Sequence, residues 1–235
     1  MKTAGPKSRS IEQVIEQQVH RWQLANREEA KKEKNIPVVT ISREPGSGGN
    51  IIAGKLSEEL GLDLFHQEII HEMAESARVS TRLLETVDEK RMNMLDEWIA
   101  SIVDRRHLWP DQYLKHLMRL VAAIGRHRRA ILIGRGANFV LPPGGRLRVR
   151  VIAPRITRIE NVAKTFGIPK IDAEKRITKT ESDRRAFIQK YFNADIADPV
   201  NYDLILNTGT LGIDGAVSSI KGALEAMPTG DASTR

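Results

Sequence analysis

A glycine-rich turn between a strand and a helix constrains the fold of this chain more than any other segment. The turn follows the β-branched run of residues 38–43 and has the sequence Glu44-Pro45-Gly46-Ser47-Gly48-Gly49-Asn50. A helix with apolar residues at helical spacing is expected over residues 51–60. This arrangement points backbone N–H groups and a helix N-terminus at a phosphate. An ordinary turn with surplus glycine is the plainer alternative, but three glycines and one serine in four residues favour phosphate binding.

The turn lacks two residues of the full Walker A motif, G-x-x-x-x-G-K-[ST], whose Lys contacts phosphate and whose hydroxyl contacts Mg²⁺. Gly49, Gly54 and Lys55 match part of that pattern, but Leu56 stands where Ser or Thr is required. Lys55 would also lie about one helical turn beyond the loop, on the wall of the helix. The match at Lys55 is therefore rejected.

Composition narrows the classes of partner. The chain has 235 residues, of which 40% are hydrophobic, enough for one α/β domain with a helical elaboration. It contains no cysteine, which excludes disulfides and thiolate metal sites and fits a reducing, cytoplasmic location. No stretch approaches the roughly 20 apolar residues that span a bilayer, so no membrane partner is expected. The net charge of +7 favours anionic partners such as nucleotides or nucleic acid, without choosing among them.

The order of elements divides the chain into three parts. An N-terminal extension, residues 1–35, contains a polar helix at 11–34, and residues 228–235 form a flexible tail. Between them, strands are expected at 38–43, 62–65, 130–133, 146–153 and 202–208. Helices are expected in the intervening segments, among them a helix that begins at Ser80 as its N-cap.

Arginines occupy positions suited to an anion. Arg135 directly follows a buried-type strand, and in open α/β sheets ligands bind beyond the carboxyl ends of the strands. An arginine that caps a loop is the alternative. Arg184 and Arg185 are adjacent on a helix and point about 100° apart, so that one can face the site while the other faces solvent. The arginines of the strand at 146–153 form either a binding patch or protection of a sheet edge.

From residue 36 to about residue 224 the chain resembles the cytidylate kinase-like family, relatives of the bacterial cytidylate kinases among the P-loop nucleoside monophosphate kinases. The order and spacing of five motifs carry this resemblance. They are TISREPGSGG at 40–49, FHQEII at 65–70, IGRGA at 133–137, SDRR at 182–185 and YDLILNT at 202–208.

The resemblance implies a three-layer α/β P-loop domain over residues 36–227, built on a parallel five-stranded sheet. It also implies a helical acceptor-binding region at about 66–129 and an arginine-bearing lid at about 170–193. By analogy, the loop at 43–50 holds the β-phosphate of ATP, and Mg²⁺ bridges the donor phosphates. Arg135, His66 and Asp183 would meet the acceptor, and Arg184 with Arg185 would stabilise the charge that develops during transfer.

The loop also departs from the pattern of that family. Gly49 stands where the phosphate-binding Lys belongs, and Asn50 stands where these relatives usually carry a basic residue. His66 stands where they commonly have Asp. We predict that Arg43, at the start of the loop, supplies part of the missing positive charge and that Ser47 offers a hydroxyl to the metal.

Two functions fit these observations. The first is ATP-dependent phosphoryl transfer to a nucleoside monophosphate, with CMP or dCMP favoured by the resemblance. The second is a non-catalytic nucleotide-binding or regulatory protein on the same fold. The missing Lys favours the second, whereas the arginines at 135, 184 and 185 favour the first, because a mere binder needs no lid. Nucleic acid is not expected as a partner, and the N-terminal helix could pair two copies of the chain into a homodimer.

Overall fold

The computed structural model describes residues 36–75, 89–127, 129–142 and 145–227. The predicted N-terminal helix, the helix that would begin at Ser80 and the C-terminal tail lie outside these described residues. The homodimer that the N-terminal helix could form therefore stays a prediction. No helix in the described ranges combines the length and apolar character needed to cross a membrane.

Five parallel strands form one sheet in the order β2-β3-β1-β4-β5. The strands are β1 Val38–Arg43, β2 Asp63–Phe65, β3 Ala130–Ile133, β4 Arg146–Ile152 and β5 Leu204–Asn207. All residues of β1 and β3 are buried, as expected for apolar strands covered on both faces. The predicted parallel five-stranded α/β fold is confirmed.

Strand β4 lies inside the sheet, between β1 and β5. The interpretation of its arginines as protection for a sheet edge is therefore wrong. Arg148 is held by Asp203, with Nη2 and Oδ1 2.6 Å apart. Arg150 points to the carboxyl end of β1, where its Nη1 donates to Ser42 Oγ at 3.0 Å.

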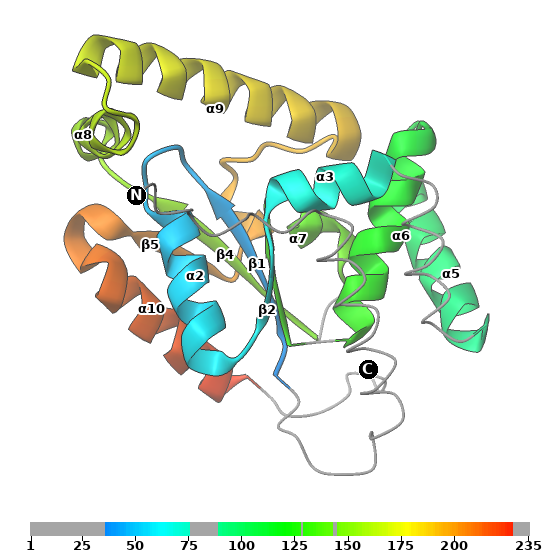
Figure 1. The fold of residues 1–235 in the computed structure, drawn as a ribbon. Coiled ribbons are helices and arrows are strands. Elements are labelled where there is room, and N and C mark those ends of the chain that lie inside the picture. The colour runs from blue at the N-terminus through cyan, green and yellow to red at the C-terminus, as the bar shows by residue number, and fades with distance from the viewer. Residues whose placement is uncertain (1–35, 76–88, 128, 143–144, 228–235) are drawn as a thin grey trace, which may run out of the picture.

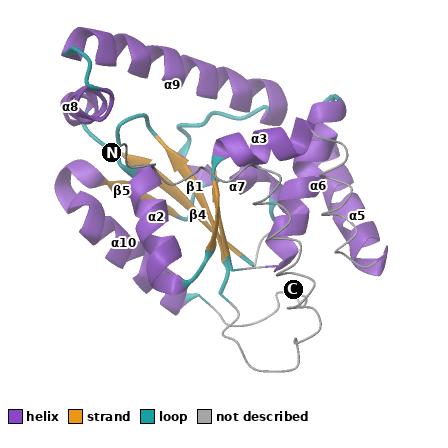
Figure 2. Ribbon diagram, in the orientation of Figure 1, coloured by secondary structure: helices purple, strands orange, loops and turns teal. Residues whose placement is uncertain are grey.

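Helices cover both faces of the sheet and make three layers (Figure 2). Side chains alternate across β1, so that Val39 and Ile41 pack on one face and Val38 on the other. Helices α2 (Gly49–Leu60) and α10 (Thr208–Ala226) cover the Val39 face. The Val38 face is covered by α3 (Gln67–Glu75), α5 (Glu89–Arg105), α6 (Gln112–His127) and α7 (Ala137–Val140).

Two further helices lie beyond the carboxyl ends of the strands (Figure 1). These are α8 (Arg155–Phe166) and α9 (Lys170–Phe192), which pack together around a small apolar cluster of their own. Helix α9 coincides with the segment predicted as a lid, and its movement stays a prediction. A 3₁₀ turn η1 (Pro199–Asn201) leads from α9 back to β5.

Candidate active site

The glycine-rich loop connects β1 to the N-terminus of α2. Gly46 and Gly48 have φ of 80° and 82°, values that other residues adopt only with strain. Gly48 is the N-cap of α2, so the amides of Gly49 and Asn50 open the helix and have no intrahelical acceptor. These amides and the positive end of the helix dipole face the region beyond the sheet, which suits a phosphate.

Arg43 fills the space beside Gly49. A Cβ placed on Gly49 would lie 2.6 Å from the Cβ of Arg43, closer than two carbon atoms can approach. Counting along the Walker pattern, Arg43 stands at its first glycine and Gly49 at its Lys. A side chain at one of these positions therefore excludes a side chain at the other. The absence of Lys at position 49 and the presence of Arg at position 43 are thus linked, because only one of the two positions has room for a side chain.

The guanidinium of Arg43 is bound within the protein. Its Nε donates to Asn50 Oδ1 at 3.1 Å and its Nη2 to Gln67 Oε1 at 3.0 Å, and only 7% of the residue is exposed. The pKa of Arg43 is lowered to about 9, first by burial and next by the positive charge of Arg184. Since the positive form is disfavoured there, an anion at this place would stabilise it.

Helix α8 contacts the glycine-rich loop through an ion pair and a hydrogen bond. Arg158 pairs with Glu181 of α9, and its Nε lies 3.3 Å from Glu44 Oε2. Asn161 Nδ2 donates to the carbonyl of Gly46 at 2.8 Å. The Gly46 position is so close to the Arg158 backbone that a Cβ would lie 2.5 Å from its carbonyl oxygen. Glu44 therefore fastens the loop to α8, which is a positioning role.

The turn after β3 holds Arg135 in a strained conformation. Gly134, Arg135 and Gly136 all have positive φ, of 76°, 50° and 69°. For an arginine this costs of order 1 kcal/mol or more, and such strain persists where the surroundings impose it. Phe192 packs against the next residue so closely that a Cβ on Gly136 would lie 2.1 Å from its ring, so that position has to be glycine. The guanidinium of Arg135 stacks on Phe187 at 5.1 Å, and its Nε is buried without a hydrogen-bond partner.

A small cavity of about 220 Å³ lies where these segments meet. Arg43, Arg135 and Arg184 line it together with Asp183 and Gln67. Arg184 Nη1 also donates to the carbonyl of Arg43 at 2.8 Å, and burial lowers the pKa of Arg184.

A fourth arginine stands directly behind this cavity. Arg150 is only 8% exposed and stacks on Tyr202, with 5.5 Å from its guanidinium to the ring centroid. Its hydrogen-bond acceptor, Ser42, lines the cavity. Within the described part of the chain, none of the arginines 43, 135, 150 and 184 has an ion-paired carboxylate. Asp183 in the lining and the nearby Glu68 balance only part of this positive charge, so the cavity suits an anion.

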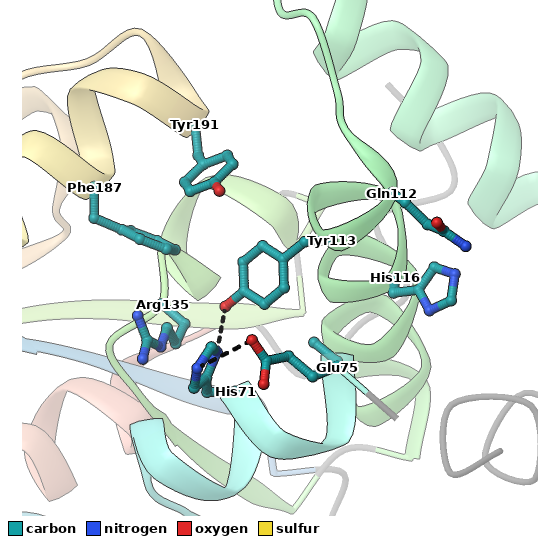
Figure 3. Close-up of a pocket in the computed structure, with 9 residues that line it drawn as sticks. His71, Glu75, Gln112, Tyr113, His116, Arg135, Phe187 and Tyr191 are labelled. Atoms are coloured by element: carbon teal, nitrogen blue, oxygen red, sulfur yellow. Dashed lines mark hydrogen bonds and ion pairs between the residues drawn. The ribbon is translucent and has the colours of Figure 1, made fainter. Parts of the chain in front are cut away.

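A second, larger cavity of about 680 Å³ adjoins the first. The two cavities share Arg135 and Phe187 in their linings. Figure 3 shows the larger one between α3, α6 and α9, with Tyr113 at its centre and His71 and Tyr191 on either side. An elongated ligand with one anionic end fits this pair of cavities, with the anion at the arginines and the bulk beside Tyr113.

The predicted site residues fall into two groups in space. Arg43, Arg135, Asp183 and Arg184 line the small cavity together. Arg185 is exposed and lines neither cavity, because neighbouring helix positions point about 100° apart. His66 also lines neither cavity among the described residues.

The sequence analysis missed Gln67, Arg150, Tyr113 and His71. The sequence positions of Gln67 and Arg150 could have indicated that they belong to the site. Gln67 is the first residue of α3, directly after His66, and Arg150 lies near the carboxyl end of an apolar strand. Tyr113 and His71 lie on two helices that are far apart in the sequence, and no local pattern relates them.

The described residues do not form a metal centre of their own. They contain no group of three or more His, Cys, Asp or Glu side chains that could hold a metal ion. Ser47 is fully buried, and its hydroxyl donates to the carbonyl of Glu44 at 2.8 Å. The geometry therefore does not support Ser47 as a metal ligand.

These features describe an α/β protein with a cluster of arginines beyond the carboxyl edge of its parallel sheet. The model of the cytidylate kinase-like family matches residues 38–210, and the chain belongs to that family. This confirms the family predicted from the five sequence motifs.

Curated relatives are similar over most of their length. A cytidylate kinase of Methanopyrus kandleri is 30% identical over 200 residues, which cover 81% of this chain and 94% of that protein. A cytidylate kinase of Ignicoccus hospitalis is 28% identical over 187 residues, covering 79% and 98%. Among solved structures, an uncharacterized protein from Eubacterium ventriosum superposes with a TM-score of 0.59 at 18% identity, covering 81% and 99%. This last likeness concerns the fold alone.

Proposed function

We propose that this chain transfers the γ-phosphoryl group of ATP to a nucleoside monophosphate, with CMP or dCMP as the favoured acceptor. Membership of the cytidylate kinase-like family supports nucleotide kinase activity in general. The preference for cytosine nucleotides rests on the relatives, which are named cytidylate kinases at 23–30% identity.

The observation that carries the proposal is the meeting of four arginines beside two adjoining cavities. In phosphoryl transfer the protein mainly positions its substrates and neutralises charge. The small cavity offers the charge, and the larger one offers room for a nucleoside. Because Arg135 lines both, it is the residue that would hold the phosphate of the acceptor at the junction.

The remaining residues take complementary roles. The open amides of the loop bind donor phosphates, and Arg43 supplies the positive charge that Lys provides in the full motif. Arg184 contacts the backbone of Arg43, lines the same cavity as Arg43 and Arg135, and stabilises charge on the transferred group. Asp183, from the same helix, faces the cavity and contacts the acceptor.

The test is ADP formation from Mg-ATP with a panel of nucleoside monophosphates, including CMP and dCMP, and with acceptor-free controls. Acceptor-dependent ADP formation that is strongest with CMP or dCMP is the expected result. ATP binding without turnover on any acceptor would contradict the kinase proposal. Failure to bind ATP at all would contradict the assignment of the loop as well.

A non-catalytic nucleotide-binding protein is the second candidate, and the loop itself favours it. Arg43 is already hydrogen-bonded to Asn50 and Gln67, and Ser47 is turned into the loop. Both groups would have to serve ATP without leaving these contacts. The same panel separates the candidates, because a binder shows nucleotide affinity with no ADP formed on any acceptor.

A further inference from the structure

A chain of three polar side chains lines the larger cavity. Glu75 and His71 lie one turn apart on α3, with Oε1 of the carboxylate 3.4 Å from His71 Nε2. On its other side, His71 Nδ1 is hydrogen-bonded to the hydroxyl of Tyr113 on α6 at 3.0 Å. Figure 3 shows this chain of contacts running from Glu75 through His71 to Tyr113, with Arg135 beside the Tyr113 hydroxyl.

The carboxylate of Glu75 sets the direction of the hydrogen bond between His71 and Tyr113. An ionised carboxylate only accepts, so Nε2 of His71 carries the proton that faces Glu75. Nδ1 of a neutral imidazole is then an acceptor, and it takes the proton of Tyr113. Burial raises the pKa of Tyr113, which keeps its hydroxyl protonated. The Tyr113 oxygen is thus left with lone pairs alone for a ligand in the cavity.

The surroundings place this acceptor atom close to the phosphate end of the cavity. Tyr113 and Arg135 line the same cavity, and Arg135 also lines the small anion cavity. The Tyr113 ring is held between His71, at 5.5 Å between centroids, and Tyr191, at 5.7 Å. Its orientation is therefore fixed by packing on both sides.

We propose that Tyr113 is a specificity-determining residue whose oxygen accepts a hydrogen bond from an O–H or N–H group of the acceptor nucleotide. His71 and Glu75 are positioning residues that keep Tyr113 in this accepting state. The inference rests on the proposed function for the identity of the ligand, a nucleoside monophosphate. The donor is either a sugar hydroxyl or an exocyclic amino group of the base, since both would lie within one nucleoside of the phosphate.

The test measures dissociation constants of CMP, dCMP, UMP and dUMP by calorimetry, for the wild type and for Tyr113→Phe. If the donor is the sugar hydroxyl, the wild type binds the ribonucleotides about tenfold more tightly than the deoxyribonucleotides, and Tyr113→Phe loses that ratio. If the donor is the amino group, the wild type binds the cytosine nucleotides about tenfold more tightly than the uracil nucleotides, and Tyr113→Phe loses that ratio. Unchanged ratios in Tyr113→Phe, or an equal weakening of all four nucleotides, would overturn the inference.

A second pair of variants tests the positioning role. Glu75→Gln places an amide that can donate or accept beside His71, so the direction of the relay is no longer imposed. We expect the selective ratio to fall by about threefold, with the affinity for the other nucleotides retained. Glu72→Gln is the matched control, because it makes the same change at an exposed position of α3 outside the cavity lining. A ratio that falls equally in both variants would overturn the role of Glu75.

Turnover measured in parallel keeps this inference separable from the proposed function. Selective binding that depends on Tyr113, without ADP formation, would reject the kinase and retain the specificity residue. ADP formation, with affinity ratios that Tyr113→Phe leaves unchanged, would support the kinase and reject the specificity role of Tyr113. Thermal unfolding of each variant identifies any loss of affinity that comes from an unfolded fraction.

Discussion

Two arginines that line the small cavity, Arg43 and Arg135, differ in how they are held. Arg43, the last residue of β1, has acceptors for Nε and Nη2 within the protein, and α8 covers the loop that follows it. Arg135, in the turn after β3, keeps a buried Nε without a partner and a backbone in the left-handed region. Arg43 is therefore hydrogen-bonded within the protein, whereas Arg135 has a donor without an acceptor beside the cavity.

Because the two arginines are held differently, their loss should affect different properties of the protein. A guanidinium that is hydrogen-bonded internally stabilises its surroundings even without a ligand, so its loss affects folding as well as binding. A buried polar group without a partner costs free energy until a ligand supplies one. Substitutions on the loop side should therefore change stability, and those at Arg135 should change affinity for the acceptor.

The largest effect is expected at Arg184, which lines the same cavity as both of these arginines. Arg184→Ala should lower kcat by about 10³-fold, because arginines that stabilise the transferred group contribute on this scale. Arg185→Ala is the matched control, since its side chain is exposed, and should stay within about twofold. Steady-state kinetics with Mg-ATP and CMP measure both. Equal losses in the two variants would contradict the role of Arg184.

The next effect concerns Arg135 and the acceptor alone. Arg135→Asn removes the charge while keeping a residue that tolerates positive φ. The acceptor KM should rise about 50-fold, the loss of a charge-assisted hydrogen bond, while the KM for ATP stays unchanged. The free energy of unfolding should change by less than about 1 kcal/mol. A rise in both KM values would show that Arg135 does not distinguish the two substrates.

The exchange between Arg43 and Gly49 predicts a change in stability. Gly49→Lys overlaps the Cβ of Arg43 and should lower the free energy of unfolding by about 2 kcal/mol, as overpacking does. For a domain of this size that corresponds to a fall in Tm of about 4–8 °C. In an Arg43→Gly background the same Gly49→Lys change should be tolerated.

This double-mutant cycle measures the coupling directly. Arg43→Ala should not relieve the overlap, because the Cβ of residue 43 is itself the clashing atom. Additive losses of stability in Arg43→Gly with Gly49→Lys would show that the two positions are independent.

The smallest effect is a pH dependence on the loop side. The pKa of Arg43 is lowered to about 9, so its positive charge is lost as the pH rises through that value. Affinity for sulfate, whose own charge is constant there, should fall about fivefold between pH 8 and pH 10. Arg43→Gln removes the titrating group and should show a flatter profile. An identical profile in both proteins would assign the pH dependence to other groups.

The sheet and the loop could be predicted from the sequence because their signals are local. The β-branched run at 38–43 and the glycines after it belong to one short segment, and Arg135 directly follows its strand. The lining of the larger cavity could not be predicted in this way. His71 and Tyr113 meet only because α3 packs against α6, and neither position stands out within its own helix.

The sequence by itself determined the parallel α/β fold, the glycine-rich turn between β1 and α2 and the family, because periodicity, glycines and ordered motifs can be recognised without tertiary contacts. Only the tertiary structure decided that Arg184, and not Arg185, faces the cavity, and that Arg43 occupies the space next to Gly49. It also showed that the arginines of β4 lie within the sheet, not at its edge. These outcomes depend on which surfaces meet, and packing between distant segments sets that through excluded volume and burial.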